Sequence, residues 1–289
     1  MAGLVMIAPT LAIVLLFTFV PVGIALVSSL TRHREIAGSI PAGTFVGLDN
    51  YTRLFTDPSF QRVLLNTVGF VVVTVGVSVP MALGFALLLE RIGHATGAIR
   101  SAIVYPTFLP MVGAGAMWLF LYNLNFGLIN DFVGLFGIPR QNWLGDPKLA
   151  LPAITVMTIW RFSSYFMIFY LAGLQSLPLS LVEAAQVDGA GFWQSTRHII
   201  VPLLRPITLF VTITAVIFSF QTYDQIAVMT NDGGPSNATN MLLFNTRLEF
   251  SFGHYDLANA QTVLMILLLF AITGIYYLRS ERRTTYLGD

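Results

Sequence analysis

The stretch SLVEAAQVDGAGFWQSTRHIIVPLLRP, residues 180–206, lies between long hydrophobic runs and carries an ordered pattern of small and polar residues. Its spacing is Glu-Ala-Ala at 183–185, three positions, Gly189, nine positions, and then Ile-x-Val-Pro at 199–202. Ser180 and Glu183 fit a capping box, in which two side chains satisfy backbone N–H groups at a helix start. We therefore expect a short helix with Ser180 as its N-cap, or with Pro178 at its first position.

The end of this helix is marked by Asp188 and Gly189, because glycine adopts the left-handed conformation that a helix C-terminus favours. Three small or apolar residues before it would share one face at helical spacing. They are Leu181, Ala184 and Ala185. Small side chains let another protein approach closely, and Glu183 adds one charge beside that face.

A second short helix is expected from Phe192 to Ile200. Pro202 and Pro206 would end it and begin the next hydrophobic run. The residues of this loop leave two interpretations open. The loop is either a docking surface for another protein or an amphipathic connector that lies on a membrane surface.

The composition is that of a membrane protein. Of 289 residues, 55% are hydrophobic and 10% are charged, whereas soluble domains carry about 25% charged residues. The net charge of +1 gives no electrostatic basis for binding nucleic acid. Cysteine is absent, which excludes disulfides and thiolate metal sites. The first apolar segment is too long for a signal peptide, so we interpret it as a retained span.

Six segments are long and apolar enough to cross a bilayer, which takes about 20 helical residues. They are residues 4–30, 63–89, 102–122, 151–174, 207–229 and 258–278. Pro106 and Pro110 fall in the third segment, where neighbouring helices or water must satisfy the lost backbone bonds. If both termini are cytoplasmic, the Lys and Arg residues of the loops divide equally between the two sides, so the positive-inside signal is weak. The sequence predicts an all-α, polytopic membrane protein with about six transmembrane helices.

Several kinds of catalytic chemistry are missing from the sequence. A P-loop needs Gly-Lys-Ser/Thr, and the single lysine, Lys148, lies between Pro147 and Leu149. No G-x-S-x-G motif occurs, and the four histidines lack H-E-x-x-H spacing. We therefore expect a protein that is not an enzyme. If ATP drives it, another chain binds the ATP.

The loop pattern at 180–206 resembles the EAA motif of the membrane subunits of binding-protein-dependent ABC importers, with Val201 in place of the usual leucine before Pro202. A second segment, from Tyr223 to Thr230 and on to Gly233-Gly234-Pro235, resembles the hallmark of carbohydrate-type permeases, the maltose and glycerol-phosphate permease family. Asn231-Asp232 stands there where that family often has glycine. The segment GLDNY at 47–51 is also typical, so the resemblance spans nearly the whole chain.

The resemblance implies the type I permease fold of ABC importers, with a single transmembrane permease domain at 1–289 and a coupling loop at 176–206. In that family the loop inserts into a cleft on the ATPase. The resemblance thus assigns ATPase coupling to five residues of this chain: Glu183, Ala184, Ala185, Asp188 and Gly189.

The resemblance also implies the partners. They are a second homologous permease subunit, two ATPase subunits, an extracytoplasmic solute-binding protein and the lipid bilayer of a prokaryotic inner membrane. This chain would bind no cofactor and no metal itself, because ATP and Mg would lie on the ATPase subunits. The function implied is alternating-access import of a sugar or related polar solute. An ion-coupled secondary transporter is the alternative, although it would need more acidic residues inside the spans.

Polar residues within the spans are candidates for the translocation pathway. Arg161 lies near the middle of the fourth segment beside Trp160, and Gln221, Tyr223 and Asp224 lie near the end of the fifth. A central arginine costs about 2.5–3.5 kcal/mol to insert, so it should face a protein interior or a water-filled cavity. In a pathway, the aromatic rings would stack on sugar rings. In the alternative, Arg161 and Asp224 make structural ion pairs or hydrogen bonds between helices.

Overall fold

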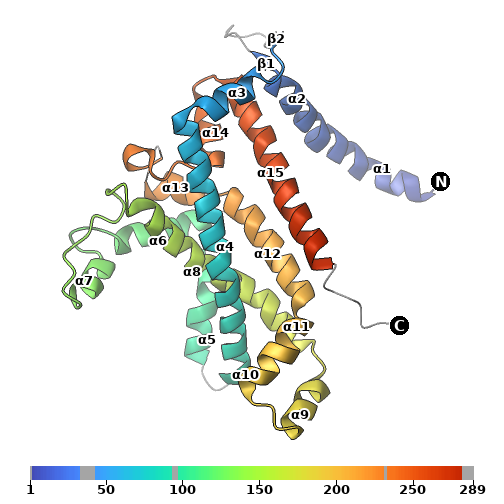
Figure 1. The fold of residues 1–289 in the computed structure, drawn as a ribbon, viewed down its shortest axis with the longest axis vertical. Helices are drawn as coiled ribbons and strands as arrows, with labels where there is room; N and C mark the ends of the chain where they lie inside the picture. The colour runs from blue at the N-terminus through green and yellow to red at the C-terminus, as the bar shows by residue number, and fades with distance from the viewer. Residues whose placement is uncertain (1, 33–42, 93–96, 231–232, 282–289) are drawn as a thin grey trace. The chain divides into compact units, whose positions relative to one another are not determined.

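The computed structural model of the chain describes residues 2–32, 43–92, 97–230 and 233–281. Most of these residues are helical (Figure 1). The strands described are two-residue segments, β1 Thr31–Arg32 and β2 Thr44–Phe45, which pair antiparallel with Thr31 opposite Phe45. The predicted all-α fold class is confirmed.

Helices that could cross a membrane occur where the sequence predicts spans. Within the described ranges, four helical segments are long and apolar enough: Met6–Ser29, Pro58–Arg91, Ala150–Gln175 and Tyr255–Leu278. Two bent pairs raise the number to as many as six, Gly97–Phe108 with Met111–Leu121 and Phe192–Leu203 with Arg205–Phe220. All six predicted segments are therefore represented, but two of them are not continuous helices.

The third predicted span is broken in its middle. α5 Gly97–Val104 passes into a 3₁₀ turn at Tyr105–Phe108. The next helix, α6 Met111–Leu121, is bent by 115° relative to the segment Gly97–Phe108. Pro110 immediately precedes α6, and its ring disfavours the helical conformation in the residue before it. Leu109 is accordingly extended, with ψ of 128°. The expectation of one helix over 102–122 is wrong for this reason.

The fifth predicted span is also divided. α12 Arg205–Phe220 ends well before residue 229, and α13 Asp224–Met229 begins after a gap at 221–223. Pro206 lies in the first turn of α12, where its missing N–H is not needed. One continuous helix over 207–229 is therefore not what forms.

The chain forms two compact units, the first made of Met1–Leu65 and Met241–Phe270. Its helices are α1 Ala2–Val14, a π-helical turn Leu15–Phe19, α2 Val20–Ser29, α3 Asp49–Thr56, α14 Leu242–Ser251, and the first parts of α4 Pro58–Ile92 and α15 Tyr255–Glu281. A small apolar core lies where α3, α4, α14 and α15 meet. It consists of Leu54, Phe60, Val63, Leu242 and Ala260.

Asn50, in the segment GLDNY, links α3 to the end of α2. Its side chain is 0% exposed. Its Nδ2 donates to the carbonyl oxygens of Ser29 at 2.9 Å and of Thr31 at 3.0 Å. Gly47 turns the chain into α3 with φ of +58°. This segment therefore holds the start of α3 against the end of α2 in the first unit.

The second unit is made of Asn66–Asn240 and Ala271–Asp289. Its further helices are α7 Leu128–Gly134, α8 Ala150–Gln175, α9 Leu179–Val187, α10 Phe192–Ser195 and α11 Val201–Leu203, besides α5, α6, α12 and α13. Its core joins buried residues of α4, α8 and α12, among them Ala82, Phe166, Tyr170 and Val211. α8 and α12 approach closely at Gly173, where an added Cβ would lie 2.1 Å from Cδ1 of Ile207.

Candidate functional site

The loop between the fourth and fifth spans contains two short helices, α9 and α10, joined at Gly189 (Figure 1). Gly189 has φ of +83°, a conformation in which most side chains are strained. The N–H of Ala190 donates to the carbonyl of Ala185 at 2.9 Å, the six-to-one bond of a Schellman cap. The predicted helix stop at Gly189 is therefore confirmed.

The start of α9 differs from the prediction. The helix begins at Leu179, so Ser180 lies inside its first turn. The N–H of Leu181 donates to the carbonyl of Pro178 at 3.2 Å. Because proline fixes φ at a helical value, the first turn forms on Pro178. The assignment of Ser180 as the N-cap is wrong, and the proline alternative is the closer one.

The second helix is longer than predicted. It begins where the N–H of Gly191 donates to Oε1 of Gln194 at 2.9 Å. It continues from α10 through a π-helical turn at Thr196–Ile200 into α11, so Pro202 lies inside it. A wider π-helical turn before Pro202 accommodates a residue that cannot donate the α-helical hydrogen bond. The 70° bend comes later, between Leu203 and Arg205, where α12 begins.

The residues assigned to ATPase coupling form an uncovered surface. Glu183, Ala184, Asp188 and Gly189 are exposed, and Ala185 is half-buried. Two apolar side chains of the same loop are among the most exposed, Val187 at 87% and Trp193 at 77%. Exposed apolar surface of this kind marks a contact with another protein or with a membrane. Both interpretations of the loop remain possible on its geometry alone.

Two further features complete this surface. An open hollow of about 360 Å³ lies beside the Gly189 turn, lined by residues between Asp188 and Ile199. The guanidinium of Arg91, in the last turn of α4, lies 5.3 Å from the ring centroid of Phe192 in α10. Cation–π contacts of this geometry are attractive. The sequence did not reveal that α4 contacts the loop.

Arg161 has a backbone partner. Its Nε donates to the carbonyl of Leu109 at 3.0 Å, and its guanidinium lies 5.9 Å from the ring centroid of Tyr165. No carboxylate pairs with it among the residues that the structure describes. Leu109 is the extended residue at the break before α6. Arg161 thus satisfies a carbonyl that the broken span leaves outside a helix, which favours a structural role.

Trp160 belongs to a row of aromatic rings. Its ring centroid lies 5.6 Å from that of Trp118. Trp118 lies 5.2 Å from Tyr122, and Tyr122 lies 5.9 Å from Trp143. Only Trp160 was a candidate from the sequence. Trp118 and Tyr122 are four positions apart in one predicted span, a spacing that places two side chains on the same face of a helix. This spacing could have identified them as a pair from the sequence.

The remaining pathway candidates lie at the break between α12 and α13. Gln221 and Asp224 are exposed, and Tyr223 is half-buried. Asp224 is the first residue of α13, where a negative charge is stabilised by the helix N-terminus. These three residues are neighbours in the sequence and lie at the same break between helices. Among the residues that the structure describes, Arg161 and Asp224 form no hydrogen bond or ion pair with each other.

The hallmark segment after α13 forms a tight loop. Gly233 and Gly234 have φ of +84° and +76°, while Asn231 and Asp232 lie outside the described residues. The side-chain hydroxyl groups of Thr230 and Thr239 form a hydrogen bond across the loop, with 2.8 Å between their Oγ1 atoms. A Cβ on Gly234 would lie 2.5 Å from Oγ1 of Thr239. Glycine is therefore required there by space as well as by backbone conformation.

Asn66 ties α4 to the end of this loop. Its Nδ2 donates to the carbonyl oxygens of Ala238 and Asn240, both at 3.1 Å. Such bonds hold neighbouring segments together within a bundle.

Comparison with known proteins gives relatives that match nearly the whole chain. It is 34% identical over 277 residues to the trehalose/maltose transport system permease protein MalF of Thermococcus litoralis, covering 95% of this chain and 92% of the relative. It is 33% identical over 291 residues to the lactose transport system permease protein LacF of Rhizobium radiobacter, covering 97% and 95%. It is 30% identical over 284 residues to the sn-glycerol-3-phosphate permease protein UgpA of Pectobacterium atrosepticum, covering 98% and 95%.

Solved structures share the fold. A chain of a bacterial alginate ABC transporter, crystallised with an alginate pentasaccharide-bound periplasmic protein, superimposes with a TM-score of 0.84. The match covers 97% of this chain and 94% of the other, at 21% identity. The fold is therefore that of an ABC importer permease.

Residues 39–286 match the family described as binding-protein-dependent transport system inner membrane component. The matched region includes the loop at 180–206 and the hallmark that ends in Pro235. Such proteins are transport components and not enzymes. The chain thus belongs to the family of multi-pass inner membrane components of binding-protein-dependent transport systems.

Proposed function

We propose that this chain is the permease subunit of an ATP-driven ABC importer for a sugar or a related polar solute, and that it forms half of the translocation pathway. The coupling loop at 176–206 docks the ATPase. The observation that carries the docking proposal is the exposed pair of short helices held apart by the left-handed turn at Gly189. Small residues at 184–185 leave room for a partner's backbone.

The partners follow from the family. We infer a second homologous permease, two ATPase subunits that hold ATP and Mg, and an extracytoplasmic solute-binding protein. The assembled complex would lie in the inner membrane of a prokaryotic cell. Relatives named for trehalose and maltose, for lactose and for sn-glycerol-3-phosphate support a sugar or glycerol-phosphate compound as the solute.

The mechanism is alternating access. Closure of the ATPase dimer would move α9 and α10, and the contact of Phe192 with Arg91 would pass that movement to α4. The polar break between α12 and α13 and the aromatic row beside Trp160 are the candidate contacts for the solute. Aromatic faces suit the apolar faces of sugar rings, and exposed Gln221 and Asp224 suit hydroxyls.

Co-purification of the ATPase with variants of the loop tests the proposal. Glu183→Ala removes a charge from the docking edge, which costs about 2–5 kcal/mol of affinity if its partner is left unpaired. Gly189→Val strains the turn, because valine does not tolerate positive φ. Both variants should insert into the membrane, lose the ATPase and lose uptake.

Gly137→Val is the matched control. Gly137 also has positive φ, at +76°, and, like Gly189, has no atom of the described residues within 4 Å of an added Cβ, but it follows α7 and lies outside the coupling loop. It should strain the chain equally and leave ATPase binding intact. If Glu183→Ala and Gly189→Val retain the ATPase and normal uptake, the loop is an ordinary connector. Uptake that survives ATP depletion under a maintained ion gradient would favour the ion-coupled alternative, which the relatives do not support.

A further inference from the structure

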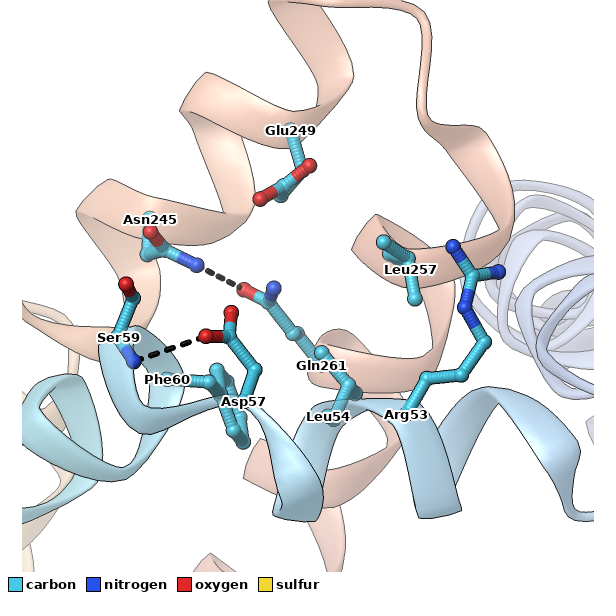
Figure 2. Close-up of a pocket in the computed structure, with 9 residues that line it drawn as sticks. All are labelled: Arg53, Leu54, Asp57, Ser59, Phe60, Asn245, Glu249, Leu257 and Gln261. Carbon is cyan, nitrogen blue, oxygen red and sulfur yellow. Dashed lines mark hydrogen bonds between the residues drawn. The ribbon is translucent and has the colours of Figure 1, made fainter.

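A polar hollow of about 240 Å³ lies in the unit formed by Met1–Leu65 and Met241–Phe270. The end of α3, the start of α4, and helices α14 and α15 line it (Figure 2). None of its residues belongs to the coupling loop or to the pathway candidates. Its polar lining includes Arg53, Asp57, Glu249 and Gln261. The proposed function requires the coupling loop at 176–206 to be cytoplasmic, and the order of the spans then makes the segments that contain α3 and α14 extracytoplasmic.

A buried amide, that of Gln261, lines the hollow. Gln261 is 1% exposed. Its Oε1 accepts from Nδ2 of Asn245 and from Oγ1 of Thr246, both at 3.1 Å, which fixes the orientation of the amide. Its Nε2 has no hydrogen-bond partner among the residues that the structure describes. In the view of Figure 2 the amide lies among the side chains that line the hollow, with the carboxylate of Asp57 on one side of it and that of Glu249 on the other. A buried N–H without an acceptor is costly, so an occupant that accepts there is favoured.

The carboxylates beside this donor keep free acceptor capacity. Oδ1 of Asp57 accepts from the backbone N–H of Ser59 at 2.9 Å. Glu249 pairs with Nδ1 of His254 at 2.7 Å. A carboxylate has about four lone-pair sites, so each group can accept a further hydrogen bond from an occupant. The hollow thus presents the buried Nε2 of Gln261 beside two acceptors, and Arg53 adds a cationic donor to its lining.

This pattern selects among ligand chemistries. An ammonium or guanidinium group only donates, so it leaves Gln261 unsatisfied. A carboxylate or phosphate accepts from Gln261, but Asp57 and Glu249 outnumber the one cation of the lining, Arg53, which already pairs with Asp256 at 3.5 Å. Among the residues described, no group of three His, Asp or Glu is placed to hold a metal ion. A hydroxyl accepts from Gln261 and donates to a carboxylate at once.

We propose that this hollow binds a single sugar unit through adjacent hydroxyl groups, one of which accepts from Gln261 Nε2 while its neighbours donate to Asp57 and Glu249. The volume is below the roughly 300–1,000 Å³ of sites for drug-sized ligands, which suits one ring and not an oligosaccharide. Phe60 and Leu257 supply an apolar wall for the C–H face of the ring. The extracytoplasmic location rests on the proposed function, whereas the ligand chemistry does not.

A unique cysteine reports on the hollow, because the native chain has none. Ser59→Cys places a thiol in its lining, and Ser251→Cys places one on exposed α14 outside it. The full-length chain in lipid nanodiscs is treated with a thiol reagent in the presence of D-glucose, CaCl₂ or L-arginine. D-glucose should slow labelling at position 59 in a saturable manner and leave position 251 unchanged. Protection by CaCl₂ or L-arginine without protection by D-glucose would overturn the proposal.

Two variants assign the contacts. Gln261→Glu keeps an acceptor for Asn245 and Thr246 but removes the N–H donor, and Asp57→Asn weakens an acceptor at an exposed position that tolerates the change. Each should raise the glucose concentration for half-protection by about three- to tenfold. If Gln261→Glu does not fold, Asp57→Asn decides alone, and an unchanged half-protection concentration in it contradicts the assignment.

The lipid composition of the nanodiscs distinguishes a glycolipid headgroup from a soluble sugar as the occupant. Nanodiscs that contain monogalactosyldiacylglycerol should protect position 59 without free sugar if a lipid headgroup is the occupant. Protection by D-glucose in nanodiscs without glycolipid indicates a soluble sugar. Absence of protection in every arm means that the hollow holds water only and overturns the proposal. ATP-dependent uptake is measured on the same variants, so its loss or persistence judges the importer function separately from this site.

Discussion

Arg161 Nε donates to the carbonyl oxygen of Leu109 at 3.0 Å, and this bond joins α8 to the break between α5 and α6. Pro110 favours the break, because its ring disfavours the helical conformation in the residue before it, and Leu109 is extended. A carbonyl freed within a span needs another donor. The arginine that the sequence places in the fourth span supplies it.

Arg161→Ala should therefore lower the stability of the folded chain by about 1–3 kcal/mol, since it leaves a carbonyl unsatisfied. Arg161→Gln keeps an N–H donor without the charge and should recover part of that stability. Thermal unfolding, purified yield and uptake are measured together. A normal unfolding temperature with lost uptake in both variants would assign Arg161 to the pathway instead.

Arg91 should affect the coupling loop. Arg91→Gln removes the cation over Phe192, a contact worth about 0.5–1 kcal/mol at an exposed position. The apparent affinity for the ATPase should fall about two- to fivefold. Phe192→Leu should give a similar loss, and the double variant should add little more.

Arg100→Gln is the control for this prediction, because Arg100 is another exposed arginine, on α5. It should leave ATPase affinity unchanged. Equal effects of the two arginine variants would indicate a general charge effect. Strict additivity of Arg91→Gln and Phe192→Leu would mean that the two residues do not interact.

The contact of α8 with α12 should not tolerate a larger residue at Gly173. A Cβ there would lie 2.1 Å from Ile207 and 3.0 Å from Leu204. Gly173→Val should destabilise the chain by about 1–3 kcal/mol through overpacking. Adding Ile207→Ala should restore part of the loss in thermal unfolding.

Gly84→Val controls for the effect of valine in a helix, because no atom of the described residues lies within 4 Å of a Cβ at Gly84 in α4. It should cost clearly less than Gly173→Val. If the two variants lose equal stability, the close approach of α8 and α12 is not what limits residue 173.

The proposed topology predicts that residues 180–205 are cytoplasmic and residues 124–150 are outside. Val187→Cys and Leu135→Cys place single thiols at positions that are 87% and 80% exposed. An impermeant thiol reagent added to intact cells should label Leu135→Cys and not Val187→Cys. The reverse pattern would invert the topology. Ser195 is a poor reporter, because it is buried.

The span positions could be predicted from the sequence, because a bilayer demands about 20 apolar residues for each crossing. The breaks could not be placed as well. Pro110 marked one of them, but a proline within a span can also be accommodated by a gentle kink. No comparable signal marked the gap at 221–223. The left-handed turn at Gly189 was predictable, since Asp-Gly is a strong local stop.

Contacts between segments that are far apart in the chain could not be predicted from the sequence. Leu109 lies 52 positions before Arg161 and contributes only a backbone carbonyl, which no residue type signals. Gln261 was not a candidate, because a lone glutamine in an apolar run is more often a helix–helix bond than a ligand contact. The assignments of Glu183 and of the pathway residues remain predictions.

The placement of the four tryptophans gives the chain two natural optical probes. Trp118, Trp143 and Trp160 lie in one row of ring contacts with Tyr122, and all three are half-buried. Trp193 stands apart in the coupling loop and is 77% exposed. With Trp193→Phe, the remaining emission would come from the aromatic row alone. The difference between the two spectra would isolate the loop, so that the proposed docking of an ATPase there and the proposed binding of solute at the aromatic row would give separate signals in unlabelled protein.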